Sequence, residues 1–370
     1  MKLRVFNELS PELEKIWRGL ENHSDVTPFQ SYEWLSHWYT VIGLPINNLQ
    51  LVVVTVINKG ETEALLPLCV SENIGIKKLE WLGGVNSDYL LPIIKRNSLF
   101  IQENFTFIWE ELLSLVNYVD LVSLSKQTEF LGKTINPFVS ELPNRFLMNS
   151  HQAFLEVPWE EYLKQNISKK VLSDSRRQRR RLLELGNLEF VIGKSTKEGQ
   201  VITSEMLKQK EARYIEKDGW NMFKITEYKD LYRSLHSDLG PLGDVHLSCL
   251  KLNDQIIATH WGFVSKEKFY YIMPTHEGSE WSRYSPGKLL LEDLMKWCYQ
   301  NGIKIFDFTG GDEPYKKIWA NKSSELSEAI IPLTVKGKLY LAFKRFKLSV
   351  KETPIIGNLG RKIFNILRKS

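Results

Sequence analysis

The chain has 370 residues, of which 43% are hydrophobic and 25% are charged, and its formal net charge is +5. This length predicts two domains of ordinary size with their own apolar cores, and the composition excludes a mainly disordered chain. No apolar run approaches the ~20 residues of a membrane-spanning helix, and residues 1–10 lack a signal-peptide pattern, so we expect a cytoplasmic protein.

The first half of the chain predicts three strands over residues 49–57, 62–71 and 78–82, then a helix over 105–116 and a strand over 119–125. Two aromatic residues, Trp34 and Trp38, precede these strands. The loop after the third strand contains Asp88 and Tyr89. Trp34 and Trp38 are spaced i, i+4, which is typical of the core face of a helix, although Trp34, Trp38 and Tyr89 could also stack on sugar rings.

A basic cluster follows the predicted junction between the two halves, which we place between residues 138 and 165. Residues 168–181 contain seven Lys and Arg, including Arg177, against the single acid Asp174. This helix could be a solvated surface, could bind substrate phosphates through its arginines, or could bind RNA. The net-acidic remainder of the chain makes RNA binding the weakest of the three and argues against DNA binding.

The second half repeats the element order of the first. Strands are predicted over residues 246–252, 255–264 and 269–274, then a helix that ends at Asn301 and Gly302, and a buried strand over 303–308. The repeat is one of element order and not of residues, so a chance recurrence of common elements is the alternative. It indicates two α/β units side by side, for which we expect domains at 1–150 and 151–335.

The entry to this last helix has the features of an anion site. Ser285 is expected to be the N-cap, Pro286 the first helical residue, and Gly287 allows a ligand to approach closely. Arg283 and Lys288 add positive charge where the N-H groups of the first turn are free. A phosphate group is the expected ligand, and an ordinary capped helix is the alternative.

Residues 336–370 form a predicted basic tail. Ten Lys and Arg stand there against one acid, Glu352, so the tail carries about +9 and the rest of the chain about −4. Apolar residues recur within it at helical spacing: Leu339, Phe343, Phe346 and Val350, then Ile363, Phe364 and Leu367. The tail could lie on an anionic membrane at the inner face of the cell membrane, or its apolar stripe could pack on the body.

Several blocks resemble the CelD-like acetyltransferases of cellulose and exopolysaccharide biosynthesis, a branch of the GCN5-related N-acetyltransferase (GNAT) superfamily. They are TPFQSYEWLSHW (27–38), LLPLCV (65–70), LEWLGGVNSDYLL (79–91), SDSRRQRRRLLELGNLEF (173–190), RYSPGKLLLEDL (283–294) and FDFTGGDEPYKKIWA (306–320). The resemblance implies an α/β protein of two tandem GNAT-like units, each a mixed, mostly antiparallel sheet flanked by helices. The tandem arrangement also looks like that of the Fem peptidyltransferases.

The resemblance further implies an acyl-CoA cosubstrate, with acetyl-CoA expected, whose pyrophosphate binds the loop of Arg283, Tyr284, Ser285, Gly287 and Lys288. Superfamily loops usually contain two glycines or a glycine and an alanine, whereas this loop has only Gly287 and Pro286 removes a donor. No metal is expected, because Cys69, Cys249 and Cys298 stand alone without a CxxC motif or paired histidine.

Acyl transfer from a thioester needs a base for the acceptor, donors for the oxyanion and an acid for the leaving thiolate. Asp88 is the first candidate base and His260 the second, although a lone histidine on a strand is more often a core residue. Tyr315 could protonate the thiolate, Asp312 is a further catalytic candidate, and Lys316 could bind a substrate anion. Asp307 is expected to be a structural partner for Lys316 or for a backbone N-H.

Three functions therefore remain open from the sequence. The first is an acyltransferase that modifies an amino sugar or related precursor, small or lipid-linked, of a surface polysaccharide. The second is a Fem-type transferase that uses aminoacyl-tRNA, and the third is a catalytically silent scaffold of a polysaccharide complex.

Overall fold

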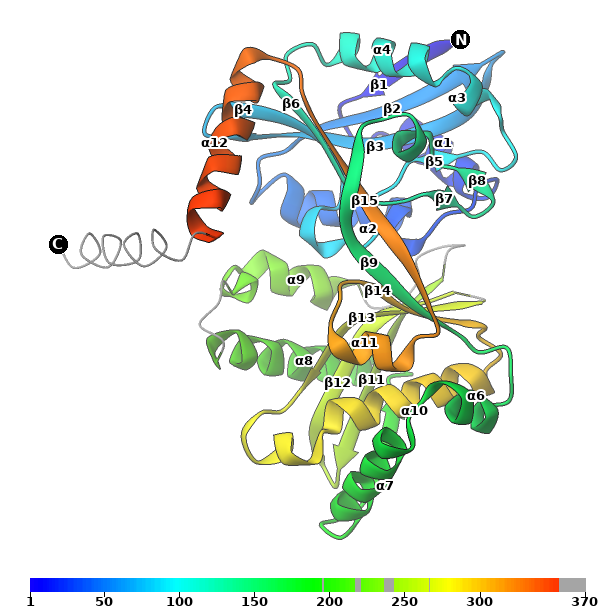
Figure 1. Cartoon of the computed structure of the whole chain (residues 1–370), viewed down its shortest axis with the longest axis vertical. Coiled ribbons are helices and arrows are strands. Elements are labelled where there is room, and N and C mark those ends of the chain that lie inside the picture. Colours follow the sequence, from blue (N-terminus) through cyan, green and yellow to red (C-terminus); the bar gives the residue numbers. More distant parts are fainter. Residues whose placement is uncertain (195, 217–220, 236–242, 266, 353–370) are drawn as a thin grey trace, which may run out of the picture.

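The valine-rich segment Gln50–Asn58 forms β2, a strand that is buried on both faces. Val52 and Val54 belong to one apolar core, and Leu51 and Val53 belong to another. Successive side chains of a strand point to opposite faces, so this apolar run requires helices on both sides of the sheet. The sheet is the middle layer of the molecule (Figure 1).

The structure is a computed structural model that describes residues 1–194, 196–216, 221–235, 243–265 and 267–352. Among these residues, thirteen strands form one sheet, in the order β1-β2-β3-β4-β6-β15-β9-β14-β13-β12-β11-β10, with β5 paired to β3. The sheet runs through both lobes of Figure 1. Its pairings are antiparallel except for β4 with β6 and β13 with β14.

The elements of the N-terminal unit follow one another as β1 (Lys2–Phe6), α1 (Pro11–Glu21), η1 (Pro28–Gln30), α2 (Tyr32–Trp38), η2 (Tyr39–Gly43), β2 (Gln50–Asn58), β3 (Glu61–Asn73), β4 (Ile76–Trp81), η3 (Gly84–Asn86), β5 (Ile93–Ile94), α3 (Phe100–Glu103), α4 (Phe105–Leu115) and β6 (Leu121–Thr128). The connection to the second unit contains β7 (Phe130–Leu131), β8 (Thr134–Ile135), α5 (Pro137–Ser140), β9 (Asn144–Phe154), α6 (Trp159–Asn166) and α7 (Lys169–Leu183).

The C-terminal unit contains β10 (Leu188–Ile192), α8 (Thr196–Glu216), η4 (Met222–Lys224), α9 (Thr226–Ser234), β11 (Asp244–Leu252), β12 (Gln255–Val264), β13 (Lys268–His276), η6 (Ser279–Tyr284), α10 (Pro286–Gln300), β14 (Ile305–Gly310) and α11 (Pro314–Trp319). The chain then returns through β15 (Lys322–Pro332) and α12 (Val335–Glu352).

The predicted repeat of element order is confirmed. In the first unit, β2, β3 and β4 form an antiparallel meander, and α4 leads to β6, which is parallel to β4. In the second unit, β11, β12 and β13 form the meander, and α10 leads to β14, which is parallel to β13. The predicted α/β fold of two units with mostly antiparallel sheets flanked by helices is therefore correct.

Two long strands join the units. β9 pairs with β14 of the second unit, β15 pairs with β6 of the first, and β9 and β15 pair with each other (Figure 1). The predicted boundary at residue 150 falls inside β9. β15 therefore returns from the end of the second unit to the sheet of the first, which the sequence analysis did not foresee.

Helices cover the two faces of the sheet differently. On one face, α1 and α2 of the first unit and α8 and α9 of the second contribute to a single continuous core. On the other face, α4 covers a core in the first unit and α10 covers a separate core in the second. The units thus share buried apolar side chains, which fixes the position of first-unit loops against the second unit.

Candidate active site

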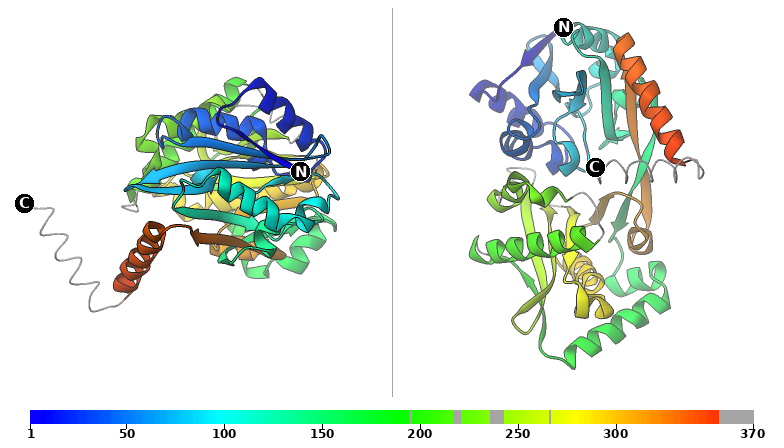
Figure 2. Two further views of the ribbon diagram at one scale, coloured as in Figure 1. Left: turned by 90° about the horizontal axis from the view of Figure 1, so that it is seen from above. Right: turned by 90° about the vertical axis from the view of Figure 1, so that its left-hand side faces the viewer.

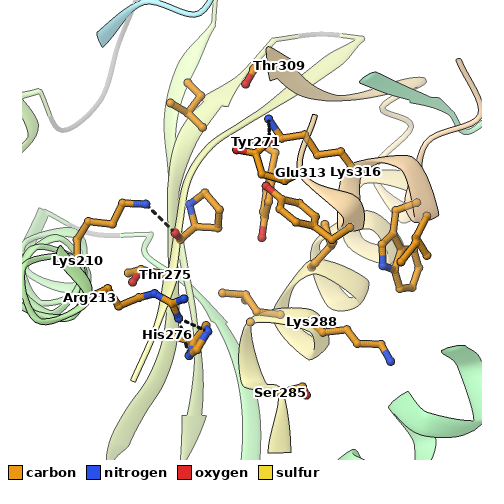
Figure 3. Close-up of a pocket in the computed structure, with 18 of the residues that line it drawn as sticks. Lys210, Arg213, Tyr271, Thr275, His276, Ser285, Lys288, Thr309, Glu313 and Lys316 are labelled. Atoms are coloured by element: carbon orange, nitrogen blue, oxygen red, sulfur yellow. Dashed lines mark hydrogen bonds and ion pairs between the residues drawn. The ribbon is translucent and has the colours of Figure 1, made fainter. Parts of the chain in front are cut away.

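Two neighbouring strands of the second unit pair at one end and separate at the other. β13 and β14 pair in parallel only where residues 268–270 lie beside residues 305–307. Beyond this point, Tyr271, Thr275 and His276 of β13 line one side of a cleft, and Thr309 and Gly310 of β14 line the other. The cleft has a volume of about 680 Å³, enough for a ligand of cofactor size (Figure 3).

The corresponding separation in the first unit is closed by the chain itself. β4 and β6 pair only where residues 78–80 lie beside residues 121–123. The segment after β4 then turns back along β6, since Leu90 donates its N-H to the carbonyl oxygen of Lys126. The chain that fills this space carries Asp88, whose side chain lies among the residues that line the cleft of the second unit.

The start of α10 lies at the mouth of the cleft, as the sequence predicted. Ser285, Gly287 and Lys288 line it, and Pro286 is the first residue of the helix. Ser285 is the N-cap residue, as predicted. It adopts a left-handed conformation with φ of 51° in place of the extended one, however, and its hydroxyl group makes no capping hydrogen bond.

Positive charge at this mouth comes from both walls. Lys288 contacts α7, where its Nζ lies 3.1 Å from Asp174 Oδ2 and donates to the Val171 carbonyl oxygen. Lys210 and Arg213, one turn apart on α8, lie on the opposite side (Figure 3). Lysine and arginine side chains facing one cleft favour an anionic ligand.

Arg213 and His276 form a linked pair on the α8 side. Arg213 donates to Nε2 of His276, and His276 Nδ1 lies 2.8 Å from the Glu277 carbonyl oxygen. Burial lowers the pKa of His276, and the adjacent Arg213 lowers it further, so the imidazole is neutral and can accept from the guanidinium. The sequence analysis missed Lys210 and Arg213. The apolar residues of α8 do not gather on one face of the helix, so the sequence does not indicate which side of α8 faces a ligand.

Asp88 is a partly exposed carboxyl group in the lining of the cleft. Burial raises its pKa, and Lys126, Thr309 and Lys316 oppose that shift by stabilising the ionised form. A carboxylate with a raised pKa, held in a cleft, has the properties of a general base. The structure therefore brings the first predicted catalytic residue into this cleft from the other unit.

Hydrogen bonds fix the loop around Asp88 on both sides. Trp34 Nε1 donates to Ser87 Oγ at 2.8 Å, and Trp38 Nε1 donates to Asn86 Oδ1 at 3.0 Å. Lys126 Nζ donates to the Ser87 carbonyl oxygen at 2.6 Å. The two tryptophans are fully buried, so they support this loop as core residues and are not positioned to stack on a sugar.

Tyr89 ties the same loop to the second unit. Its hydroxyl group donates to Asp307 Oδ1 at 2.8 Å, and Gln152 Nε2 donates to Asp307 Oδ2 at 2.8 Å. Asp307 also accepts from the backbone N-H of Thr309. This is one of the two structural roles predicted for it, the other being a partner for Lys316. Tyr89 is buried and lies outside the cleft lining, so its position suits support of Asp88 better than contact with a substrate.

The loop also depends on glycine. Gly84 has φ of 54°, and a Cβ atom there would lie 2.7 Å from Cζ2 of Trp38. We expect Gly84→Ala to lower the free energy of unfolding by about 1–3 kcal/mol, because both the backbone conformation and the contact are unfavourable. Chemical denaturation measures this change. Gly60→Ala is the matched control, since Gly60 has φ of 87° but open space around it, and an equal loss in both variants would contradict the contact with Trp38.

The α11 side of the cleft carries the remaining polar groups. Glu313, Tyr315 and Lys316 line it. Tyr315 and Lys316 were predicted from the sequence as site residues, and Glu313 was not. Lys316 Nζ donates to the Gly310 carbonyl oxygen at 2.5 Å and lies 3.0 Å from Glu313 Oε2. Burial raises the pKa of Tyr315, so its hydroxyl group stays protonated and can act as a donor.

Two predicted catalytic residues lie outside the cleft lining. His260 is buried in an aromatic layer, where its ring stacks on Tyr271 at 4.7 Å, and burial holds its pKa well below the usual range. Asp312 accepts from Asn149 Nδ2 at 2.9 Å and lies 3.4 Å from His151 Nε2. The Asn149 hydrogen bonds lower the pKa of Asp312 and keep it ionised.

Three further predicted binding residues are also outside the lining, namely Arg177, Arg283 and Tyr284. Tyr284 is buried, with the guanidinium groups of Arg181 and Arg283 at 4.8 and 4.9 Å from its ring centre. Arg177 is exposed on α7 and pairs with Asp174 at 2.6 Å. The structure thus brings together Asp88, Ser285, Gly287, Lys288, Tyr315 and Lys316 from the predicted set.

The described residues contain no group of three or more His, Cys, Asp or Glu side chains that could hold a metal ion. Within the same part of the chain, none of the helices combines the length and the apolar character needed to span a bilayer.

Residues 169–317 match a protein family described as acetyltransferase (GNAT) domain. This region contains the meander, α10, β14 and every cleft residue named above except Asp88. The C-terminal unit is accordingly similar to a GNAT acetyltransferase domain. No curated protein sequence matches the chain.

Solved structures with a similar fold cover nearly the whole chain. The crystal structure of FemX has a TM-score of 0.58 at 11% identity, covering 90% of this chain and 98% of that one. The C-terminal domain of a putative lysylphosphatidylglycerol synthetase from Agrobacterium fabrum has a TM-score of 0.53 at 11% identity, covering 90% and 95%. L-PGS from Bacillus licheniformis has a TM-score of 0.52 at 11% identity, covering 92% and 98%. At these identities the similarity shows the fold alone.

Proposed function

We propose that the protein is a cytoplasmic acyl-CoA-dependent N-acyltransferase with acetyl-CoA as the donor, and the match of residues 169–317 to a GNAT acetyltransferase domain supports this proposal. The observation that carries this proposal is the cleft itself. It joins a cationic mouth at α10 to a carboxyl group with a raised pKa, Asp88, within one continuous space.

The residues of the cleft suit the anionic part of such a donor. Lys210 and Arg213 on one wall and Lys288 on the other can bind phosphate oxygens, together with the N-H of Gly287. Pro286 has no N-H, and Lys288 and Leu289 donate theirs to the Ser285 carbonyl oxygen, so side-chain cations supply more of the binding than the helix end does. This compensates for the missing second glycine.

The same cleft can catalyse transfer of the acyl group to an amine. Asp88 accepts the proton that the acceptor nitrogen loses as that nitrogen bonds to the thioester carbonyl carbon. The carbon–sulfur bond then breaks, and the Tyr315 hydroxyl group donates a proton to the departing sulfur. Both groups reach the cleft, from the loop after η3 and from α11.

Lys126 lowers the pKa of the proposed base Asp88, so the pH profile of activity tests its role. Its ammonium group favours ionised Asp88, so Lys126→Met should raise the pKa of Asp88 further. Because the ionised carboxylate is the active form, activity falls as the pH decreases through this pKa. We therefore expect the acidic limb of kcat/KM to move up by about 1 pH unit in Lys126→Met and to stay in place in Lys126→Arg. An unchanged limb in Lys126→Met would contradict the role of Lys126.

We propose an amino sugar, or a related precursor of a surface polysaccharide, as the acceptor. Support comes from the resemblance to the CelD-like family, whose blocks 27–38 and 79–91 build the Asp88 loop and the α2 residues that hold it. The test is release of free CoA thiol from acetyl-CoA with a panel of amino sugars, compared with the corresponding N-acetylated sugars. No thiol release above hydrolysis with any amine would argue against transfer.

A Fem-type reaction with aminoacyl-tRNA is the alternative, and the position of α7 favours it. Val171 of α7 lines the cleft mouth, and Arg176, Arg177 and Arg180 are exposed on the same helix. If acetyl-CoA does not bind and tRNA binds with a steep salt dependence, this alternative replaces the first. A silent scaffold would bind neither.

A further inference from the structure

The C-terminal helix α12 is anchored to the body at its first turn. Asp120 accepts from the backbone N-H of Leu333 at 2.9 Å and from Thr334 Oγ1 at 2.7 Å. Gly337 lies so close to the Asp120 carbonyl oxygen that a Cβ atom would be 2.2 Å from it. From this anchor, α12 projects away from the sheet (Figure 2).

The side of α12 that packs on the body is not its apolar stripe. Gly337 is buried, and Tyr340 and Leu341 are half-buried, which identifies the packed side. The apolar stripe lies on the opposite side and is 65–73% exposed at Val335, Leu339, Phe343 and Phe346. At 3.6 residues per turn, these side chains occupy an arc of roughly 100°. The predicted alternative, that the stripe packs on the body, is therefore wrong for the described part of the tail.

Positive charge borders the arc on both sides. By helical position, Lys338 and Arg345 lie beyond one edge, and Lys336 lies beside the other edge, where its Nζ donates to the Gly75 carbonyl oxygen. Residues 335–351 contain no acidic residue. An exposed aromatic and aliphatic face between two basic borders is complementary to a surface that is apolar inside and negatively charged outside.

We propose that α12 binds the surface of an anionic lipid membrane, with Leu339, Phe343 and Phe346 inserted among the lipid chains and the lysines at the headgroups. Lipid explains both halves of the pattern, because a nucleic acid would account for the lysines but would leave the two phenylalanines in water. The anchor at Asp120 then holds the catalytic units at a fixed position relative to the membrane, which suits an acceptor that is lipid-linked.

The test is flotation of the full-length protein with vesicles of pure phosphatidylcholine and with vesicles that also contain phosphatidylglycerol. We expect binding to the anionic vesicles that weakens with salt. Phe343→Ser/Phe346→Ser should weaken it more than tenfold, and Lys338→Gln/Arg345→Gln should weaken it roughly tenfold, since each basic residue near the surface contributes a several-fold factor. Phe107→Ser/Phe146→Ser is the matched control, because those phenylalanines are half-exposed elsewhere, and it should bind like the original chain.

A second copy of the chain could cover the exposed stripe of α12 in place of lipid. Light scattering in the absence of vesicles detects such a dimer. A dimer that the Phe343→Ser/Phe346→Ser variant dissociates, together with no flotation, would overturn the membrane proposal. Equal binding to neutral and anionic vesicles would overturn the electrostatic part of the proposal. An equal loss of binding in the control variant Phe107→Ser/Phe146→Ser would overturn the role of α12. Thiol release in solution is measured separately, so failure of membrane binding is distinguishable from failure of the proposed reaction.

Discussion

Asp88→Asn should lower kcat by about 10²–10⁴-fold while the affinity for acetyl-CoA changes little, because the amide cannot accept a proton from the attacking amine. Asparagine has nearly the same shape, so the supporting bonds of Trp34, Trp38 and Lys126 to the neighbouring residues remain possible. Steady-state kinetics with the best amino-sugar acceptor, alongside calorimetric titration with acetyl-CoA, measures the two effects separately.

Asp312→Asn is the control, since Asp312 was predicted as catalytic but lies outside the cleft lining and bonds to Asn149. We expect its kcat to remain within about twofold of the original. If Asp312→Asn loses activity and Asp88→Asn does not, the assignment of the base is wrong. If both variants keep full activity, catalysis needs no carboxylate at either position.

In the proposed reaction the first unit contributes the base, Asp88, to the cleft of the second unit and binds no ligand itself. Its strands β4 and β6 separate as β13 and β14 do, but its own chain turns back into that space and carries the carboxyl group across to the second unit. Tyr89 and Asp307 form a hydrogen bond between the two units beside it. The proposed base and the proposed donor site therefore belong to different units, and both units contribute to the shared core beneath them.

The strands and helices that carry the repeat were predictable, because each is a strongly apolar or periodic segment. Residues 255–264, for example, were predicted as a strand and form β12. β9 and β15 were missed because their pairing joins segments about 170 residues apart, and a pairing of that kind leaves no local pattern. α8 was missed, and with it the cationic wall of the cleft.

Within the site, the local motif was predictable and the directions of side chains were not. The sequence places Gly287 and Lys288 at a helix start, and the structure confirms that position. The sequence gives no sign that Trp34 and Trp38 support residues 86 and 87, because those contacts depend on how the units pack. Likewise, His260 and Tyr284 are in suitable segments but point into cores.

Gly287→Glu should raise the Kd for acetyl-CoA at least about 100-fold, since a carboxylate would stand where phosphate oxygens bind. A Cβ atom at this position lies 3.0 Å from Cδ2 of His276, so the new side chain is also directed at the Arg213–His276 pair. An acid in the first turn of a helix is normally favourable, so the change should not unfold α10. Gly287→Gln separates size from charge: we expect a smaller loss that does not depend on salt, whereas the loss in Gly287→Glu should decrease as salt screens the repulsion. Micromolar binding that is the same in all three proteins would show that the anion lies elsewhere and that α10 is an ordinary helix.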